Sequence, residues 1–193
     1  MAHAPLAPTS PPHRARTSRL PIETPRLQLR SFVSEDAKKV FRMSREQAMQ
    51  AWLPSQVYRD ESYAASVLAH LIVQCCVPAN PRVGPYVLGV QLRSTGELVG
   101  HVGLSPWGEA VEIGFAIESS HQRKGIATEA VGAACRWARD VFSLEVILGI
   151  TAARNVASRG VLLRAGFAWQ KDEVLRFQGL EQPVMFFTFS RRP

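Results

Sequence analysis

Residues 112–131, EIGFAIESSHQRKGIATEAV, contain the side chains and spacing best suited to binding an anion. An apolar run at residues 113–117 predicts a buried strand, and a helix is expected to open near Thr128. Between them lies the segment Gln122-Arg123-Lys124-Gly125-Ile126-Ala127. Backbone N–H groups at the start of a helix point outward, and the helix dipole favours negative charge there. Gly125 allows a close approach, and the two basic residues before it add positive charge. This loop is therefore predicted to bind a pyrophosphate.

The segment is neither of the commoner phosphate loops. The chain has no G-x-x-x-x-G-K-[ST] pattern, and no G-x-G-x-x-G with an acidic residue about 20 positions later. Alone, the pattern also fits an ordinary crossover from strand to helix that turns at a glycine. A second pattern follows, however, because residues 144–150 predict another buried strand. After that strand come Asn155, Ser158 and a short helix that ends in Gly166-Phe167.

Together these motifs resemble the GNAT superfamily of N-acetyltransferases. The spacing Q-x-x-G-x-A is similar to its acyl-CoA loop, and the strand, asparagine and short helix are similar to the segment that follows. Residues 22–37, IETPRLQLRSFVSEDA, resemble the T-x-R-L-x-L-R opening of the RimJ/RimL-like branch, which acetylates ribosomal-protein N-termini. Residues 94–104 resemble its central hairpin. The resemblance covers about residues 22–189. It implies a mixed α/β fold in which a mostly antiparallel central sheet carries helices on both faces.

The resemblance also implies that acetyl-CoA is the co-substrate. The backbone of Phe115 and Ile117 would pair with the pantetheine arm as an added strand does. Asn155 would bond a pantetheine amide, and Arg164 would lie near the nucleotide. The expected acetyl-CoA site is Phe115, Ile117, Gln122, Arg123, Lys124, Gly125, Ile126, Ala127, Thr128, Asn155, Ser158 and Arg164. The residues alone leave alternatives open, since Asn155 can be a helix cap and Arg164 an exposed helix residue.

Acetyl transfer to an amine needs a neutral amine aligned with the thioester and a group that takes its proton. Glu112 is the first candidate base, because many GNAT enzymes place a carboxylate at this position. His101 is the second, since the ordinary pKa of imidazole lies near neutrality. Ser158 resembles the serine that the RimJ/RimL-like branch places near the CoA sulfur, and Leu162 stands where many GNAT enzymes have a tyrosine. Alternatively, Glu112 faces solvent, His101 is structural, and Ser158 only caps its helix.

The composition is that of a globular chain with a basic surface. The 193 residues are 46% hydrophobic and carry a formal net charge of +7. No apolar run approaches the roughly 18 residues that a membrane span needs, and no secretory signal is apparent. The three cysteines suggest neither a disulfide framework nor a metal site. The sequence contains no stripe of basic residues interleaved with aromatic residues, the pattern that would predict a nucleic-acid partner. We expect a cytoplasmic monomer or homodimer that binds no metal, membrane or nucleic acid.

The chain divides into a leader and one domain. Residues 1–21 contain five prolines and three arginines, and are predicted to be a disordered basic leader. Residues 22–193 are long enough for a single domain with a sizeable core. Within it, the hydrophobic patterns predict strands at residues 26–32, 86–92, 98–104, 110–117, 144–150 and 184–189. Helices are expected to begin near Ser34, Asp60, Thr128 and Asn155.

The leading interpretation is an acetyl-CoA-dependent N-acetyltransferase. The acceptor would be a primary amine, on a protein N-terminus, an amino acid, a polyamine or a related small amine, that attacks the thioester directly. Two alternatives stay open: a toxin-like acetyltransferase acting on aminoacyl-tRNA, and a non-catalytic acyl-CoA-binding sensor. The acceptor pocket is expected to be formed by residues 41–63, the hairpin near Trp107 and residues 177–183.

Overall fold

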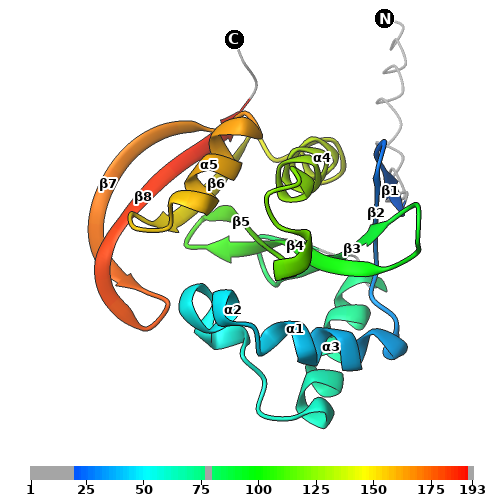
Figure 1. Ribbon diagram of the computed structural model, residues 1–193. Helices are drawn as coiled ribbons and strands as arrows, with labels where there is room; N and C mark the ends of the chain where they lie inside the picture. The colour runs from blue at the N-terminus through cyan, green and yellow to red at the C-terminus, as the bar shows by residue number, and fades with distance from the viewer. Residues whose placement is uncertain (1–19, 77–79, 191–193) are drawn as a thin grey trace, which may run out of the picture.

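The computed structural model describes residues 20–76 and 80–190, so nearly all of the predicted leader lies outside the described residues. Its centre is an eight-stranded sheet with the order β1-β2-β3-β4-β5-β6-β8-β7 (Figure 1). All neighbouring strands are antiparallel except β5 and β6, which are parallel. The strands are β1 (Ile22–Glu23), β2 (Leu27–Arg30), β3 (Tyr86–Leu92), β4 (Leu98–Trp107), β5 (Ala110–Ile117), β6 (Val146–Ala152), β7 (Ala168–Phe177) and β8 (Leu180–Ser190).

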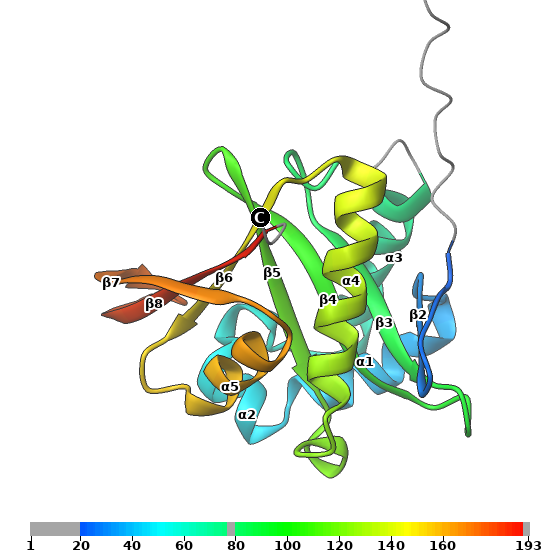
Figure 2. The same cartoon turned by 90° about the horizontal axis from the view of Figure 1, so that it is seen from above.

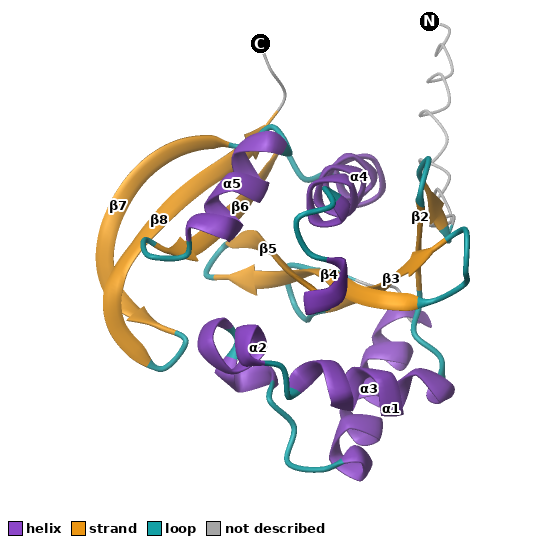
Figure 3. Cartoon of the chain, in the orientation of Figure 1, coloured by secondary structure: helices purple, strands orange, loops and turns teal. Residues whose placement is uncertain are grey.

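Helices cover both faces of the sheet, as Figures 1 and 3 show. On one face lie α4 (Ile126–Phe142) and α5 (Val156–Arg164), and on the other lie α1 (Ala37–Ser44), α2 (Gln47–Trp52) and α3 (Glu61–Cys76). Short 3-10 turns complete the described chain: η1 (Ser34–Asp36), η2 (Pro54–Gln56) and η3 (Ser119–His121). The predicted fold class, a mixed and mostly antiparallel sheet between helices, is confirmed. None of the described helices is long and apolar enough to cross a membrane.

The larger core lies between α4 and the sheet. In α4 the apolar residues recur at helical spacing, and Val131, Cys135 and Ala138 are fully buried. They join a core that includes Val102 and Val111 from β4 and β5. Small residues on this face of α4 let the helix approach the sheet closely. The helix is thereby held against the strands that precede and follow the predicted anion loop.

A smaller core lies under α1 and α3, on the opposite face. Phe32, Leu68 and Leu98 are buried there. The start of α3 is fixed by Asp60, whose Oδ1 accepts a hydrogen bond of 2.7 Å from the backbone N–H of Tyr63. The predicted helix start at Asp60 is confirmed.

The helix after the loop begins two residues earlier than the sequence predicts, at Ile126 rather than near Thr128. Gly125 immediately precedes it with a left-handed φ of +76°, a conformation that glycine adopts without steric cost. Ile126 is buried and starts the apolar face of α4. The side chain of Ile126 therefore belongs to the core, and only its backbone N–H is open to a ligand.

An ion pair between a partly buried arginine and a buried aspartate sets the position of α1. Arg30, at the end of β2, donates to both carboxylate oxygens of Asp36, at 2.7 and 2.9 Å. Asp36 is only 8% exposed, and its Oδ2 also accepts from the backbone N–H of Val33 at 2.9 Å. The second arginine of the T-x-R-L-x-L-R motif thus joins β2 to the first helix.

Asp36→Ala is expected to lower the free energy of unfolding by about 2–4 kcal/mol, because it leaves the Arg30 guanidinium partly buried and without its partner. Urea denaturation followed by circular dichroism measures this loss. The control is Glu35→Ala in the same turn, where the exposed side chain should change the stability by less than about 0.5 kcal/mol. Equal losses in the two variants would show that the pair does not hold α1.

Candidate functional site

The site is built around the place where β5 and β6 separate. These parallel strands are in register only at Glu112 and Leu148. Toward their carboxyl ends the two arrows diverge, as Figure 2 shows. β5 continues from Glu112 to Ile117 beside β4 alone. One edge of β5 is therefore left without a strand partner over residues 113–117.

The unpaired edge exposes the backbone groups that the resemblance to GNAT enzymes implies for the pantetheine arm. At the end of the β4–β5 pairing, Glu118 N–H donates to Val99 O at 2.8 Å. Because hydrogen-bonded pairs alternate along an antiparallel ladder, the even-numbered residues of β5 bond to β4. The backbone groups of Phe115 and Ile117 then point to the other edge, where β6 has diverged. Gln122 already uses one of them, since its Nε2 donates to Ile117 O at 2.8 Å.

The loop before α4 has the backbone of an anion site. Arg123 and Gly125 both have positive φ, +59° and +76°. Within the described part of the chain, the N–H groups of residues 123–128 find no acceptor. Arg123 and Lys124 are exposed beside them. Successive free N–H groups at a helix N-terminus attract negative charge, so the loop can hold a phosphate or pyrophosphate.

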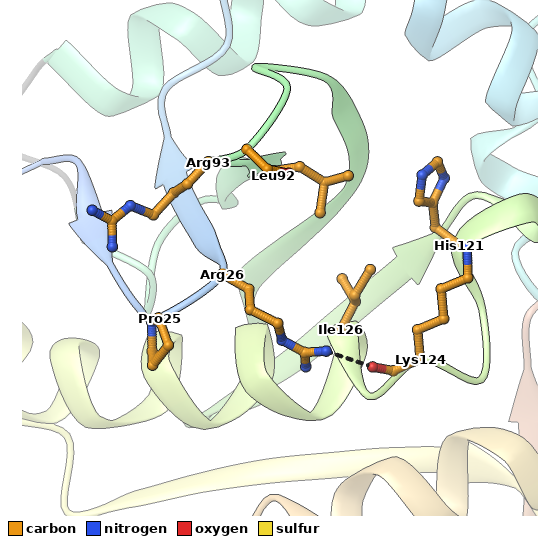
Figure 4. Close-up of a pocket in the computed structure, with 8 residues that line it drawn as sticks. Pro25, Arg26, Leu92, Arg93, His121, Lys124 and Ile126 are labelled. Carbon is orange, nitrogen blue, oxygen red and sulfur yellow. Dashed lines mark hydrogen bonds between the residues drawn. The ribbon is translucent and has the colours of Figure 1, made fainter.

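The loop is held from the side by the Thr24-Pro25-Arg26 segment. Arg26 donates from Nη1 to Lys124 O at 2.8 Å, the bond drawn in Figure 4. Its Nε donates to Glu129 Oε2 at 2.6 Å. Glu129 Oε1 accepts from Thr24 Oγ1 at 2.6 Å and from Arg26 N–H at 3.0 Å. Burial alone would raise the pKa of Glu129, but the bonds from Thr24 and Arg26 lower it overall. This network, called the loop clamp below, was not predicted from the sequence, although its residues all lie within the motif-bearing segments 22–37 and 112–131.

A cavity of about 380 Å³ lies beside the loop clamp and is the one shown in Figure 4. The arginine and lysine side chains that line it donate hydrogen bonds to other groups of the protein. Arg26 is held as described, Lys124 Nζ donates to Ser120 O at 2.9 Å, and Arg93 Nη1 donates to Thr24 O at 2.8 Å. These cations stabilise the loop and its neighbours.

Asn155 and Ser158 lie at the carboxyl end of β6. Asn155 is buried and caps α5, because its Oδ1 accepts from Ser158 N–H at 3.1 Å. Asn155 therefore acts as a helix cap, which was the alternative role left open by the sequence. Its amide N–H groups and the Ser158 hydroxyl donate to no acceptor in the described residues. Both groups are available to a ligand.

Leu162 and Arg164 occupy different parts of α5. Leu162 is 1% exposed and packs below Gly149 of β6, so no polar side chain replaces the tyrosine common at this position. Arg164 is exposed in the last turn of α5. At 1.5 Å per residue, it lies about 9 Å along the helix axis from Ser158. The predicted role of Arg164 toward the nucleotide stays a prediction.

The two candidate bases lie on the opposite face of the sheet from α4. Ser105 of β4 stands opposite Glu112, and His101 stands opposite Ala116. Glu112 and His101 are therefore separated by four residues along the ladder, roughly 13 Å, and do not act as a pair. Burial raises the pKa of Glu112 to about 7 and lowers the pKa of His101 to about 4. Glu112 thus has the pKa of a general base at neutral pH, and His101 is a much weaker base.

A cavity of about 270 Å³ opens above this face, under α1 and α3. His101, Gly103, Ser105 and Gly114 form part of its floor, and its walls come from α1, α2, α3 and the segment between α2 and α3. It includes Met43, Met49, Ser55, Tyr58 and Tyr63 from the region that the sequence predicts for the acceptor. Trp107 and the residues after Phe177 are not among its lining residues in the described chain. Trp107 packs instead against Phe177 and Phe186, with ring centroids 6.3 and 6.4 Å apart.

The structure thus brings most of the predicted residues to one region. Because β5 and β6 are parallel, their carboxyl ends place the anion loop and the Asn155–Ser158 segment at the same edge of the sheet. Glu112 lies at the last point where the strands pair, and His101 lies in the cavity behind it.

Comparison with known proteins identifies this arrangement. The family described as an acetyltransferase (GNAT) domain matches residues 26–168. The uncharacterized N-acetyltransferase YoaA of Bacillus subtilis (strain 168) is 28% identical over 158 residues, which are 80% of this chain and 85% of YoaA.

Solved structures share the fold. The ribosomal-protein-S5-alanine acetyltransferase of Vibrio fischeri superposes with a TM-score of 0.72 at 20% identity, over 89% of this chain and 97% of that one. The microcin C7 self-immunity acetyltransferase MccE, solved with acetyl-CoA and AMP, gives a TM-score of 0.70 at 16% identity, over 87% and 94%. The chain belongs to the GNAT family and is an acetyl-CoA-dependent acyltransferase.

Proposed function

We propose that this acyltransferase moves the acetyl group of acetyl-CoA to a primary amine by direct attack, with Glu112 as the general base. The observation that carries the proposal is the position of Glu112. It is the last residue of β5 that pairs with β6, and the unpaired edge begins at the next residue. A thioester aligned along that edge would have its carbonyl near the only carboxylate of β5.

The acetyl-CoA site is proposed to follow the unpaired backbone. The N–H groups of residues 123–128 would bind the pyrophosphate, with Arg123 and Lys124 adding positive charge. The free groups at Phe115 and Ile117 would bond the pantetheine arm, as an added strand does. Gln122 acts indirectly, because its side chain ties the loop to Ile117 O. The acetyl-CoA that accompanies MccE supports binding of this co-substrate to the shared fold.

The chemistry follows from these positions. The neutral amine nitrogen attacks the thioester carbonyl carbon, a C–N bond forms, and the C–S bond breaks. The proton lost by the amine goes to the Glu112 carboxylate, directly or through water. The departing thiolate takes a proton from solvent or a hydrogen bond from the Ser158 hydroxyl. With Leu162 in the core, Ser158 is the proposed donor on α5.

Release of free thiol from acetyl-CoA, measured with a thiol-trapping reagent over a panel of amines, tests the proposal. Release that depends on the amine supports an N-acetyltransferase. Tight acetyl-CoA binding without release for any amine would indicate the sensor. Salt-dependent binding of aminoacyl-tRNA, with transfer to it, would indicate the tRNA-directed enzyme.

Gly125→Ala is expected to weaken acetyl-CoA binding by about five- to thirtyfold, since in the binding conformation it adds a Cβ to a left-handed residue at a cost of about 1–2 kcal/mol. That Cβ would also lie 3.3 Å from Arg26 Nη2 and disturb the loop clamp. Isothermal titration calorimetry measures the Kd. The matched control is Gly108→Ala, which adds the same strain (φ +57°) in a turn with open space around it. Equal Kd values for acetyl-CoA in the two variants would show that the loop is not part of the acetyl-CoA site.

Glu112→Gln is expected to lower kcat/KM by about 10²–10⁴ at pH 7.5, because the side chain keeps its shape and loses its basicity. In the parent, kcat/KM should rise with pH through about 7, as the carboxyl loses its proton. In Glu112→Gln the increase of kcat/KM near pH 7 should be absent, and only the increase caused by deprotonation of the amine should remain. A loss of less than about threefold would make Glu112 structural, and His101→Ala would be measured next.

The thermal stability of Glu112→Gln gives an independent check. A carboxyl whose folded pKa is raised stabilises the fold at low pH, and this contribution is lost as pH rises from about 4.5 to about 7. The substitution should therefore raise Tm more at pH 8 than at pH 5, by about 2–4 °C per kcal/mol recovered. An equal change at both pH values would mean that Glu112 is not desolvated.

A further inference from the structure

The cavity of about 270 Å³ under α1 and α3 is open at the centre of the sheet because two glycines form part of its floor. Gly103 of β4 and Gly114 of β5 stand opposite each other. Gly114 is exposed although it lies in an inner strand. An added Cβ at Gly114 would meet nothing within 4 Å, whereas one at Gly103 would lie 2.8 Å from Val87 Cγ2. The space above Gly114 is therefore open.

This open space adjoins the proposed base. Side chains of a strand alternate between its faces, so Gly114 and Glu112 share the face that carries the cavity. They are two residues apart, roughly 7 Å along β5. A group bonded to an amine at Glu112 can therefore extend over Gly114 into the cavity.

The cavity carries no fixed charge. Among the described residues that line it, none has a carboxylate, an ammonium or a guanidinium group. Its walls include Phe32, Val40 and Leu68. His101 is uncharged at neutral pH, because burial lowers its pKa to about 4. An ammonium or carboxylate that entered would lose its hydration without gaining a partner.

The cavity has room for a small apolar body. Its volume is nearly twice the roughly 150 Å³ of an apolar protein cavity that binds benzene. It is slightly smaller than the roughly 300–1,000 Å³ that ligand pockets span. One aromatic ring on a short chain fills such a space.

We propose that the acceptor is a primary amine whose neighbouring substituent is uncharged, apolar and about the size of one aromatic side chain, and that this substituent occupies the cavity above Gly114. The substituent belongs either to a small aralkylamine or to the first residue of a peptide. The inference rests on the proposed function, and it disfavours polyamines and free amino acids among the acceptors that the sequence left open.

A panel of matched amines tests the charge rule on the full chain with acetyl-CoA. Phenylalaninamide and free phenylalanine have the same ring, but the first has a neutral amide where the second has a charged carboxylate. 2-Phenylethylamine has an apolar substituent and spermidine a cationic one. A peptide that begins with phenylalanine tests whether the acceptor amine belongs to a peptide N-terminus. The rate of thiol release is divided by the concentration of the neutral form of each amine, so that differences in amine pKa do not affect the comparison. The apolar amines should exceed spermidine and free phenylalanine by at least about tenfold in kcat/KM. Preference for either charged acceptor would overturn the proposal.

Gly114→Val tests the place of the substituent. The Cβ has open space, so Tm and the Kd for acetyl-CoA should stay close to those of the parent. The side chain would fill the space above β5, and kcat/KM for 2-phenylethylamine should fall at least about tenfold, with a smaller fall for ethylamine. Gly114→Ala should give an intermediate result. An unchanged preference for 2-phenylethylamine over ethylamine in Gly114→Val would place the substituent elsewhere.

Binding of 2-phenylethylamine, measured by calorimetry in the absence of acetyl transfer, separates the two proposals. The inference is supported if the parent chain binds 2-phenylethylamine but not spermidine, and if Gly114→Val no longer binds 2-phenylethylamine. The cavity would then bind apolar amines even where no thiol is released. Absence of thiol release would then contradict the proposed function alone. Tighter binding of spermidine than of 2-phenylethylamine would contradict the inference.

Discussion

The separation of β5 from β6 is the constraint on which the site depends. A strand inside a sheet normally satisfies its backbone groups on both edges. In this fold β5 does so only as far as Glu112, because β6 diverges after Leu148. The groups left over at Phe115 and Ile117 must bond to water, a side chain or a ligand, and Gln122 takes one of them. A binding edge for an extended, amide-containing arm follows from this divergence.

The two arginines of the opening T-x-R-L-x-L-R segment hold the two sides of that site. Arg26 ties the anion loop and the first turn of α4 to the edge of the sheet through Lys124 O and Glu129. Arg30 ties α1 to the end of β2 through Asp36. One short strand thus orients both the loop on one face and a helix that covers the cavity on the other. An arginine suits both places because its fork of donors can serve several acceptors at once.

The same physical cause gives the two titratable groups of the cavity face their opposite shifts. Burial disfavours the charged form, so it raises the pKa of the Glu112 carboxyl and lowers that of the His101 imidazole. Near pH 7 the carboxyl is poised between its two forms, while the imidazole stays neutral. The carboxyl is therefore the better proton acceptor, and the imidazole helps to keep the cavity free of charge.

The local patterns of the sequence predicted most of the elements and the order of the motifs, but not β1 or α2, and they placed the strand after α4 two residues too early. The ranges of β3 and β5 agree with the apolar runs, and the buried stripe of α4 follows from its helical spacing. The anion loop could be predicted because its glycine, its basic pair and its place before a helix are all local features.

What only the tertiary structure decided depends on residues far apart in the chain. The carboxylate of Glu129 meets Thr24 and Arg26 more than 100 positions away, and no local pattern specifies such a contact. The register between β5 and β6 fixes where the free edge starts, and so distinguishes Glu112 from His101. The charge-free cavity arises from β4, β5, α1 and α3 together, and its depth over Gly114 depends on an absent side chain. Helix and strand periodicity is set by neighbouring residues, whereas desolvation and enclosed space exist only once distant elements pack.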